Sequence, residues 1–207
     1  MIMNNTKIPE LLLTRLSHDL VGNIGAISNG FELVSEETDL DFIKDTCTLL
    51  AQSSTVVARR IKFFRLAYGL VNKATSDRDE VKFATRDYLL TIGNKDFPID
   101  FSLYVNDSMN ETYFKIIMSL TMILADITIR GGNITVRNDS DMVELSLVTE
   151  RLAPQDRLDI INDIITEKND IIDAKYSPLY YARSLSQEIN KKIDFVNSVS
   201  GVKFIIR

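Results

Sequence analysis

The sequence predicts an α+β chain in which an N-terminal helical hairpin, paired into a dimeric four-helix bundle, precedes a C-terminal α/β sandwich. Up to Tyr68, apolar residues recur every three or four positions, which is the spacing of amphipathic helices. Beyond residue 80, short strand-like stretches alternate with helical ones. The 207 residues suffice for one large domain or two small ones. We place the boundary in the polar stretch 72–80, which gives a helical domain at 1–75 and a second domain at 76–207.

The N-terminal domain is expected to be two long antiparallel helices joined by a short loop. The apolar positions of the first helix are Leu13, Leu16, Leu20, Ile24, Ile27, Phe31 and Val34. Those of the second helix alternate steps of four and three, as in a bundle helix: Ile43, Cys47, Leu50, Ser54, Val57, Ile61, Phe64 and Tyr68. Thr38 or Asp39 could cap the second helix.

A single hairpin cannot enclose its own apolar stripe. Two hairpins paired across a dimer axis would bury the stripe in a four-helix bundle. The alternative is that the rest of the same chain covers it. We favour the dimer, because the series from Ile43 to Tyr68 runs without a break.

The second domain is expected to mix helices with mostly antiparallel strands, with the helices on one face of a mixed sheet. The expected strands are 80–83, 97–105, a hairpin at 133–150 that turns at 139–141, and a closing pair within 192–207 that turns at Gly201. The expected helices are 84–92, 111–129, 154–166 and 177–192, of which the second is stopped by Gly131 and Gly132.

Composition excludes several classes of protein. A net charge of -5 and a pI near 5.0 argue against a general nucleic-acid or anionic-membrane binder. The single cysteine, Cys47, excludes an internal disulfide and any multi-cysteine metal site. No signal segment is recognisable, and no apolar run approaches the roughly 20 residues of a membrane span. We therefore expect a cytoplasmic protein.

The stretch "TRLSHDLVGNIGAISNGF" (14–31) holds His18, the only histidine of the chain. At about 100° per residue, His18 lies roughly 160° from the mean direction of the apolar stripe, and Thr14, Gly22 and Gly25 share its face. Each glycine costs about 0.5 to 1 kcal/mol relative to alanine inside a helix. We interpret this face as a low surface that another molecule approaches closely; close helix packing is the alternative reason for the glycines.

An exposed imidazole beside a carboxylate suits phosphoryl transfer. Neutral imidazole is a nucleophile near pH 7, and Asp19 could accept the proton of the other ring nitrogen or act as a base. Positioning carries most of the catalysis in such reactions. Arg15, one turn earlier, could steady phosphate charge or could be a solvated surface arginine. A harmless surface histidine is the remaining alternative for His18.

"LSHDLVGNIGAI" resembles the phosphoacceptor box of sensor histidine kinases, in which an acidic residue follows the histidine. Gly22 and Asn23 stand where that box usually has a small polar residue and a proline. The second domain resembles a Bergerat-type kinase ATP-binding domain along 113–136 and 177–207. Ser119 and Ile123 replace its two asparagines, and the D-x-G-x-G motif and glycine-rich lid are absent from the sequence.

Both halves together are similar to ChpT-type histidine phosphotransferases, through "RLSHDLVGNIGAISNGFEL" and "FFRLAYGL". The resemblance implies a homodimer with a degenerate kinase architecture that shuttles phosphate between receiver-domain aspartates of a hybrid kinase and of response regulators. It implies His18 and Asp19 as catalytic residues, and a partner-binding surface that we assign to Thr14, Arg15, Val21, Gly22 and Gly25.

The resemblance also implies a phosphotransferase without a cofactor of its own, and we expect magnesium only on the partner receiver domain. We expect neither nucleic-acid nor membrane binding. Two alternatives stay open from the sequence: a histidine kinase with an unusual nucleotide site, and a non-catalytic dimeric scaffold.

Overall fold

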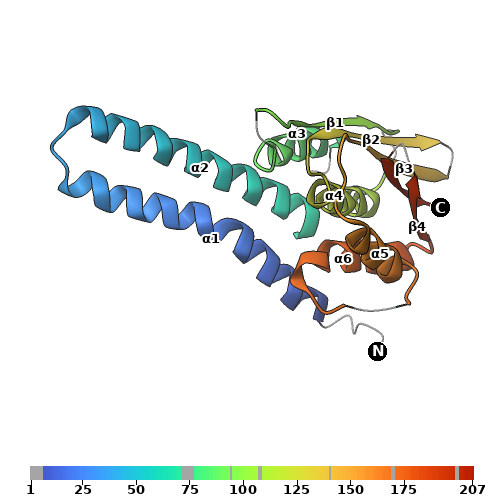
Figure 1. Cartoon of the computed structure of the whole chain (residues 1–207). Coiled ribbons are helices and arrows are strands. Elements are labelled where there is room, and N and C mark those ends of the chain that lie inside the picture. The colour runs from blue at the N-terminus through green and yellow to red at the C-terminus, as the bar shows by residue number, and fades with distance from the viewer. Residues whose placement is uncertain are drawn as a thin grey trace.

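A long helical hairpin projects from a compact α/β body in the computed structural model (Figure 1), which describes residues 7–70, 77–93, 95–106, 109–139, 141–168, 171–198 and 201–207. The hairpin consists of α1 (Lys7–Glu36) and α2 (Leu40–Tyr68), which pack side by side along their length. Asp39 caps α2, because its side chain accepts hydrogen bonds from the backbone amides of Asp41 and Phe42. The predicted hairpin is confirmed, and of the two capping residues considered, Thr38 and Asp39, the structure shows Asp39.

The two helices approach closely where Gly30 faces Leu50. Both residues are buried, and a Cβ added to Gly30 would lie 2.5 Å from Cδ2 of Leu50. The absence of a side chain at Gly30 therefore lets the outer parts of α1 and α2 come together.

The predicted apolar stripe divides into two sets. Leu50 and Phe64 are buried within the chain. Leu13, Phe31 and Ile61 lie outside it, with 68%, 61% and 49% of their surface exposed. The described part of the chain therefore leaves much of the stripe uncovered, as the dimer interpretation expects, and the dimer itself stays a prediction.

The body is a five-stranded sheet of order β1-β2-β3-β5-β4 that carries helices on one face (Figure 1). Its elements are α3 (Arg78–Leu89), β1 (Ile99–Tyr104), α4 (Glu111–Asp126), β2 (Gly132–Asp139), β3 (Met142–Val148), α5 (Gln155–Ile165), the short 3-10 helix η1 (Ala174–Tyr176), α6 (Ser177–Glu188), β4 (Ile193–Ser198) and β5 (Gly201–Ile206). Only β1 and β2 pair in parallel; the other neighbours are antiparallel. The predicted mixed sheet with helices on one face is confirmed.

The core lies between the sheet and α4, whose residues from Ile116 to Ala125 are all buried. Strand side chains alternate between this core and the opposite face, as the buried positions of β1 and β5 show. The end of α2 joins the same core, where the rings of Phe63 and Tyr88 stack at 4.1 Å between centroids. The hairpin is thereby anchored to the body through its inner end.

One predicted element was wrong, and one predicted helix ends earlier than expected. The strand expected at 80–83 is the first part of α3. Four residues are too few to distinguish the two-residue repeat of a strand from the 3.6-residue repeat of a helix, and the longer pattern is helical. The buried positions of α3 are Val81, Ala84, Thr85, Tyr88 and Leu89, and Asp77 caps the helix by accepting from Asp79 N.

The helix expected at 111–129 ends at Asp126, before the two glycines. Thr128 leaves the helix to form a β-bridge with Leu152. Gly131 and Gly132 instead make the turn into β2 with positive φ of 58° and 156°, and a Cβ on Gly131 would lie 2.4 Å from the Pro98 carbonyl oxygen.

The boundary predicted between residues 75 and 76 lies outside the described residues and stays a prediction. No helix within the described ranges is both long and apolar enough to cross a membrane.

Candidate functional site

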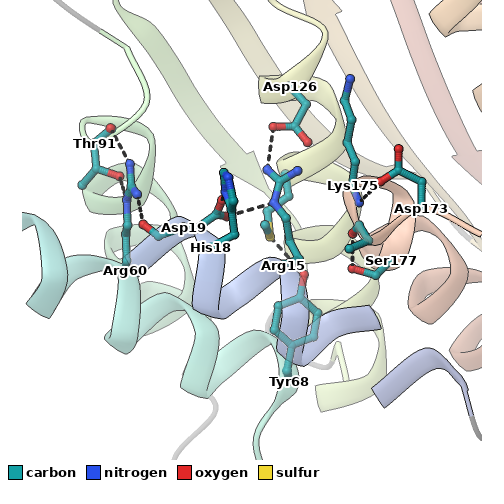
Figure 2. A network of polar contacts seen from close by, with 12 residues as sticks. Arg15, His18, Asp19, Arg60, Tyr68, Thr91, Asp126, Asp173, Lys175 and Ser177 are labelled. Atoms are coloured by element: carbon teal, nitrogen blue, oxygen red, sulfur yellow. Dashed lines mark hydrogen bonds and ion pairs between the residues drawn. The ribbon is translucent and has the colours of Figure 1, made fainter. Parts of the chain in front are cut away.

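His18 lies on the outer surface of α1, where α1 passes the body. Its side chain is 86% exposed. The expectation of an outward-facing imidazole, drawn from the helical geometry of α1, therefore agrees with the structure. Figure 2 shows the imidazole next to Asp19, among polar side chains from α1, α2 and the body.

Asp19 stands beside the imidazole but is much less exposed, at 15%. Its Oδ1 lies 3.7 Å from Nδ1 of His18, which is ion-pair range but longer than a hydrogen bond. Nε2 of His18 is thus the ring nitrogen that does not face Asp19. A small rotation of either side chain would let Asp19 accept a hydrogen bond from Nδ1–H.

Arg15 is not the surface residue considered from the sequence, because its side chain is only 13% exposed. Its Nε donates to Oδ2 of Asp19 at 2.9 Å, and its Nη2 donates to Oδ1 of Asp126 at 2.9 Å. Asp126 is the last residue of α4, so this bridge joins the helix that carries His18 to the C-terminal body (Figure 2). The predicted contact of Arg15 with a partner's phosphate stays untested.

Electrostatics favour a charged Arg15. Burial alone lowers the pKa of Arg15, but the attraction and hydrogen bonds of Asp126 and Asp19 together raise that pKa above its ordinary value. Burial raises the pKa of Asp126, and Arg15 opposes that shift. Arg15 therefore stays a cation between two carboxylates.

A second arginine holds the main chain at the same place. Nη1 of Arg60 on α2 donates to the backbone oxygen of Asp19. Its Nε and Nη2 donate to the side-chain and backbone oxygens of Thr91, each at 3.1 Å. Arg60 thus ties α1, α2 and the segment after α3 together to one side of the imidazole (Figure 2).

The face around His18 is open. Thr14, Val21 and Gly22 are exposed, and Gly25 is half-buried. A Cβ added to Gly22 or Gly25 would meet no atom within 4 Å in the described part of the chain. Within the described residues, neither glycine is therefore required for close packing, unlike Gly30.

The positions that align with nucleotide-binding asparagines are closed. Ser119 and Ile123 are fully buried on α4, and the Ser119 hydroxyl donates to the Lys115 carbonyl oxygen at 2.8 Å. α6 packs closely against α4 along the body. The segment before α6 is also anchored, because the Tyr180 hydroxyl donates to the Ile171 carbonyl oxygen at 2.8 Å.

Sequence reasoning missed Asp126, Arg60 and Thr91. Asp126 is 111 positions from Arg15, so no local spacing joins them. A carboxylate at the end of an otherwise apolar helix was the one available signal. Among the described residues, no group of three or more His, Cys, Asp or Glu side chains could hold a metal ion; the expectation of no cofactor stays a prediction.

Comparisons with known proteins fit this arrangement. Protein phosphotransferase ChpT of Brucella abortus (strain 2308) is 25% identical over 201 residues, which cover 94% of this chain and 92% of that protein. A solved structure described as a bacterial phosphotransferase has the same fold, with a TM-score of 0.79 and 22% identity over 100% of this chain and 98% of that one.

The family described as "Histidine phosphotransferase C-terminal domain" matches residues 93–199. This range spans more than half of the 207 residues and includes β1, α4 and α6. On this evidence the chain belongs to the histidine phosphotransferase family, as its resemblance to ChpT-type proteins implied.

Proposed function

We propose that His18 accepts a phosphoryl group from the aspartyl phosphate of one receiver domain and passes it to the aspartate of another. The observation that carries this proposal is the geometry at His18. The imidazole is almost fully exposed, its Nδ1 faces a held carboxylate, and its face of α1 offers two glycines with open space above them.

The transfer needs no proton from solvent. The lone pair of Nε2 forms the N–P bond while the P–O bond to the receiver's aspartate breaks, and that electron pair returns to the carboxylate. The proton stays on Nδ1, where Asp19 stabilises the ring's growing positive charge. Transfer to the next receiver reverses these steps. Because little covalent chemistry falls to the protein, positioning of the two partners supplies most of the rate.

The partner surface is proposed to be Thr14, Val21, Gly22 and Gly25. For in-line transfer, the imidazole must reach the receiver's phosphoryl group without obstruction from the surface of α1. The two glycines lower the surface of α1 within two turns of His18. Magnesium, in this proposal, is supplied by the receiver and not by this chain.

The hairpin is proposed to form a four-helix bundle in a homodimer. Leu13, Ile24 and Phe31 on α1 are more than half exposed in the single chain, and Ile61 on α2 is 49% exposed. A second hairpin would remove this apolar surface from water. We also propose that the protein works in the cytoplasm and that its body binds no ATP, since Ser119 and Ile123 are buried.

The test is receiver-dependent labelling. Wild type, His18→Gln and a matched control, Glu32→Gln, which changes an exposed residue of the same helix, are incubated with a phosphorylated receiver. We expect acid-labile label on wild type and Glu32→Gln and none on His18→Gln, with all three equally folded by circular dichroism. Acid-labile label on His18→Gln would refute the assignment, because no other histidine exists in the chain.

A further inference from the structure

We propose that Asp126, acting through Arg15, is a positioning residue that holds the Asp19 carboxylate towards His18. The C-terminal body would thus contribute to phosphoryl transfer without binding a nucleotide. This inference rests on the proposed role of His18.

The two oxygens of Asp19 have separate partners. Oδ2 accepts from Nε of Arg15 at 2.9 Å, while Oδ1 faces Nδ1 of His18 at 3.7 Å. Without Arg15, the carboxylate could rotate about its side-chain torsions and turn Oδ1 away from the ring. Arg15 therefore selects the rotamer that leaves one oxygen for the imidazole.

Arg15 is itself held from the other side. Its Nη2 donates to Oδ1 of Asp126. The side chains of Arg15, Asp19 and Asp126 are each only 13% to 16% exposed. The guanidinium is planar, and its donors have a fixed arrangement, so contact with Asp126 sets the direction in which Nε points. Asp126 is therefore the anchor, Arg15 the connection and Asp19 the group that meets the histidine (Figure 2).

Asp126 depends on Arg15 for its neutralisation. Its Oδ2 is buried and accepts no hydrogen bond within the described part of the chain. Removing Arg15 alone would leave a poorly compensated buried carboxylate and could weaken the fold. The informative variant is therefore Arg15→Gln/Asp126→Asn, which removes both charges and keeps polar side chains that can hydrogen-bond.

Arg60 holds the main chain at Asp19, whereas Arg15 holds the Asp19 side chain. Arg60 binds the backbone oxygen of Asp19 and so fixes α1 whether or not Arg15 is present. The helix is thus expected to stay in place in the double variant. What changes is the freedom of the Asp19 side chain.

The first readout is the tautomer of His18, which is observable without ambiguity because the chain has one histidine. Long-range ¹H–¹⁵N correlation spectra at a pH where the ring is neutral report which nitrogen carries the proton. In wild type we expect the Nδ1–H form to be enriched, since Asp19 favours it. The double variant and Asp19→Asn should both lose this enrichment. A wild-type tautomer ratio in the double variant would overturn the inference.

The second readout is the rate of transfer from a phosphorylated receiver in single turnover. We expect the double variant to be about 10- to 100-fold slower, the scale of a misplaced catalytic group, with unchanged receiver affinity. In an Asp19→Asn background the same two changes should have less than about a twofold further effect, because they act through Asp19. A full additional loss in that background would overturn the proposed route.

Arg65→Gln is the matched control, since Arg65 is a largely exposed arginine whose Nη2 is 3.9 Å from Glu80. It should leave the tautomer and the rate unchanged; an equal loss in Arg65→Gln would show that general charge, and not positioning, is responsible. Failure of the proposed function is distinguishable, because it would appear as label on His18→Gln whatever the tautomer result.

Discussion

Replacing Gly22 and Gly25 with alanine should stabilise the protein and slow phosphoryl transfer. Both glycines lie in the interior of α1, and an added Cβ at either would meet no atom within 4 Å of the described chain. The fold therefore gains helix propensity without a clash. The docking surface, in contrast, is raised by two methyl groups where a receiver is proposed to approach.

The magnitudes follow from this geometry. Glycine costs about 0.5 to 1 kcal/mol relative to alanine in a helix interior, so the double change should add about 1 to 2 kcal/mol to the free energy of unfolding. For a chain of this size, each kcal/mol of added stability raises the melting temperature by about 2 to 4 °C, so we expect a rise of about 2 to 8 °C. Overpacking in a close contact typically costs about 1 to 3 kcal/mol, which would weaken receiver affinity by about 5- to 150-fold.

The control is Gly30→Ala, on the same helix. Its Cβ would lie 2.5 Å from Cδ2 and 3.2 Å from Cγ of Leu50, so the leucine must move. The overpacking cost of about 1 to 3 kcal/mol should cancel or exceed the gain in helix propensity. Gly30→Ala should thus be no more stable than wild type while keeping its receiver affinity, the reverse of the other two changes.

The assay is thermal denaturation together with receiver titration and labelling at His18. A Gly22→Ala/Gly25→Ala protein that is more stable and transfers phosphate at the wild-type rate would refute the reasoning that this face must be low. A protein that is less stable would show that the two positions pack against something, such as a second protomer.

Two other predictions concern assembly and nucleotide. Ile61→Asp would place a charge in the proposed dimer interface twice by symmetry; at about 2 kcal/mol per copy it should weaken dimerisation by roughly 10³-fold, as light scattering over a dilution series would show. Wild type that is monomeric at micromolar concentration would contradict the bundle. Calorimetry with magnesium and ATP should show no binding heat, because Ser119 and Ile123 are buried. Saturable binding, or labelling of His18 by ATP alone, would instead support the alternative that the chain is a histidine kinase.

Sequence periodicity predicted those features that depend on neighbours along the chain. The hairpin and the outward direction of His18 follow from helical spacing, and the structure agrees with both. The residue types at the break left Thr38 and Asp39 as candidate caps, and the structure shows Asp39. The strand expected at 80–83 failed because four residues carry too little periodicity. Extending the same pattern to Tyr88 would have shown the helix.

The setting of Arg15 could not be predicted in this way. Its exposure depends on Asp126, which tertiary folding brings to α1 from 111 residues away. Arginine on the polar side of a helix usually indicates solvent, and only the body packed against α1 converts it into a buried bridge. Ion pairs between residues so far apart in the chain produce no recognisable pattern in a single sequence.

The projecting end of the hairpin has a thermodynamic consequence. At about 1.5 Å per residue, the 30 residues of α1 span about 45 Å, and much of that length extends beyond the body (Figure 1). Between residues 13 and 62, all of which the structure describes, only Gly30, Thr46 and Leu50 are buried. So few buried groups place this end among the regions that open locally at low free energy. If a second hairpin supplies the missing contacts, ordering of the hairpin tips and association become one equilibrium, and the stability of the tips varies with protein concentration while that of the sheet does not.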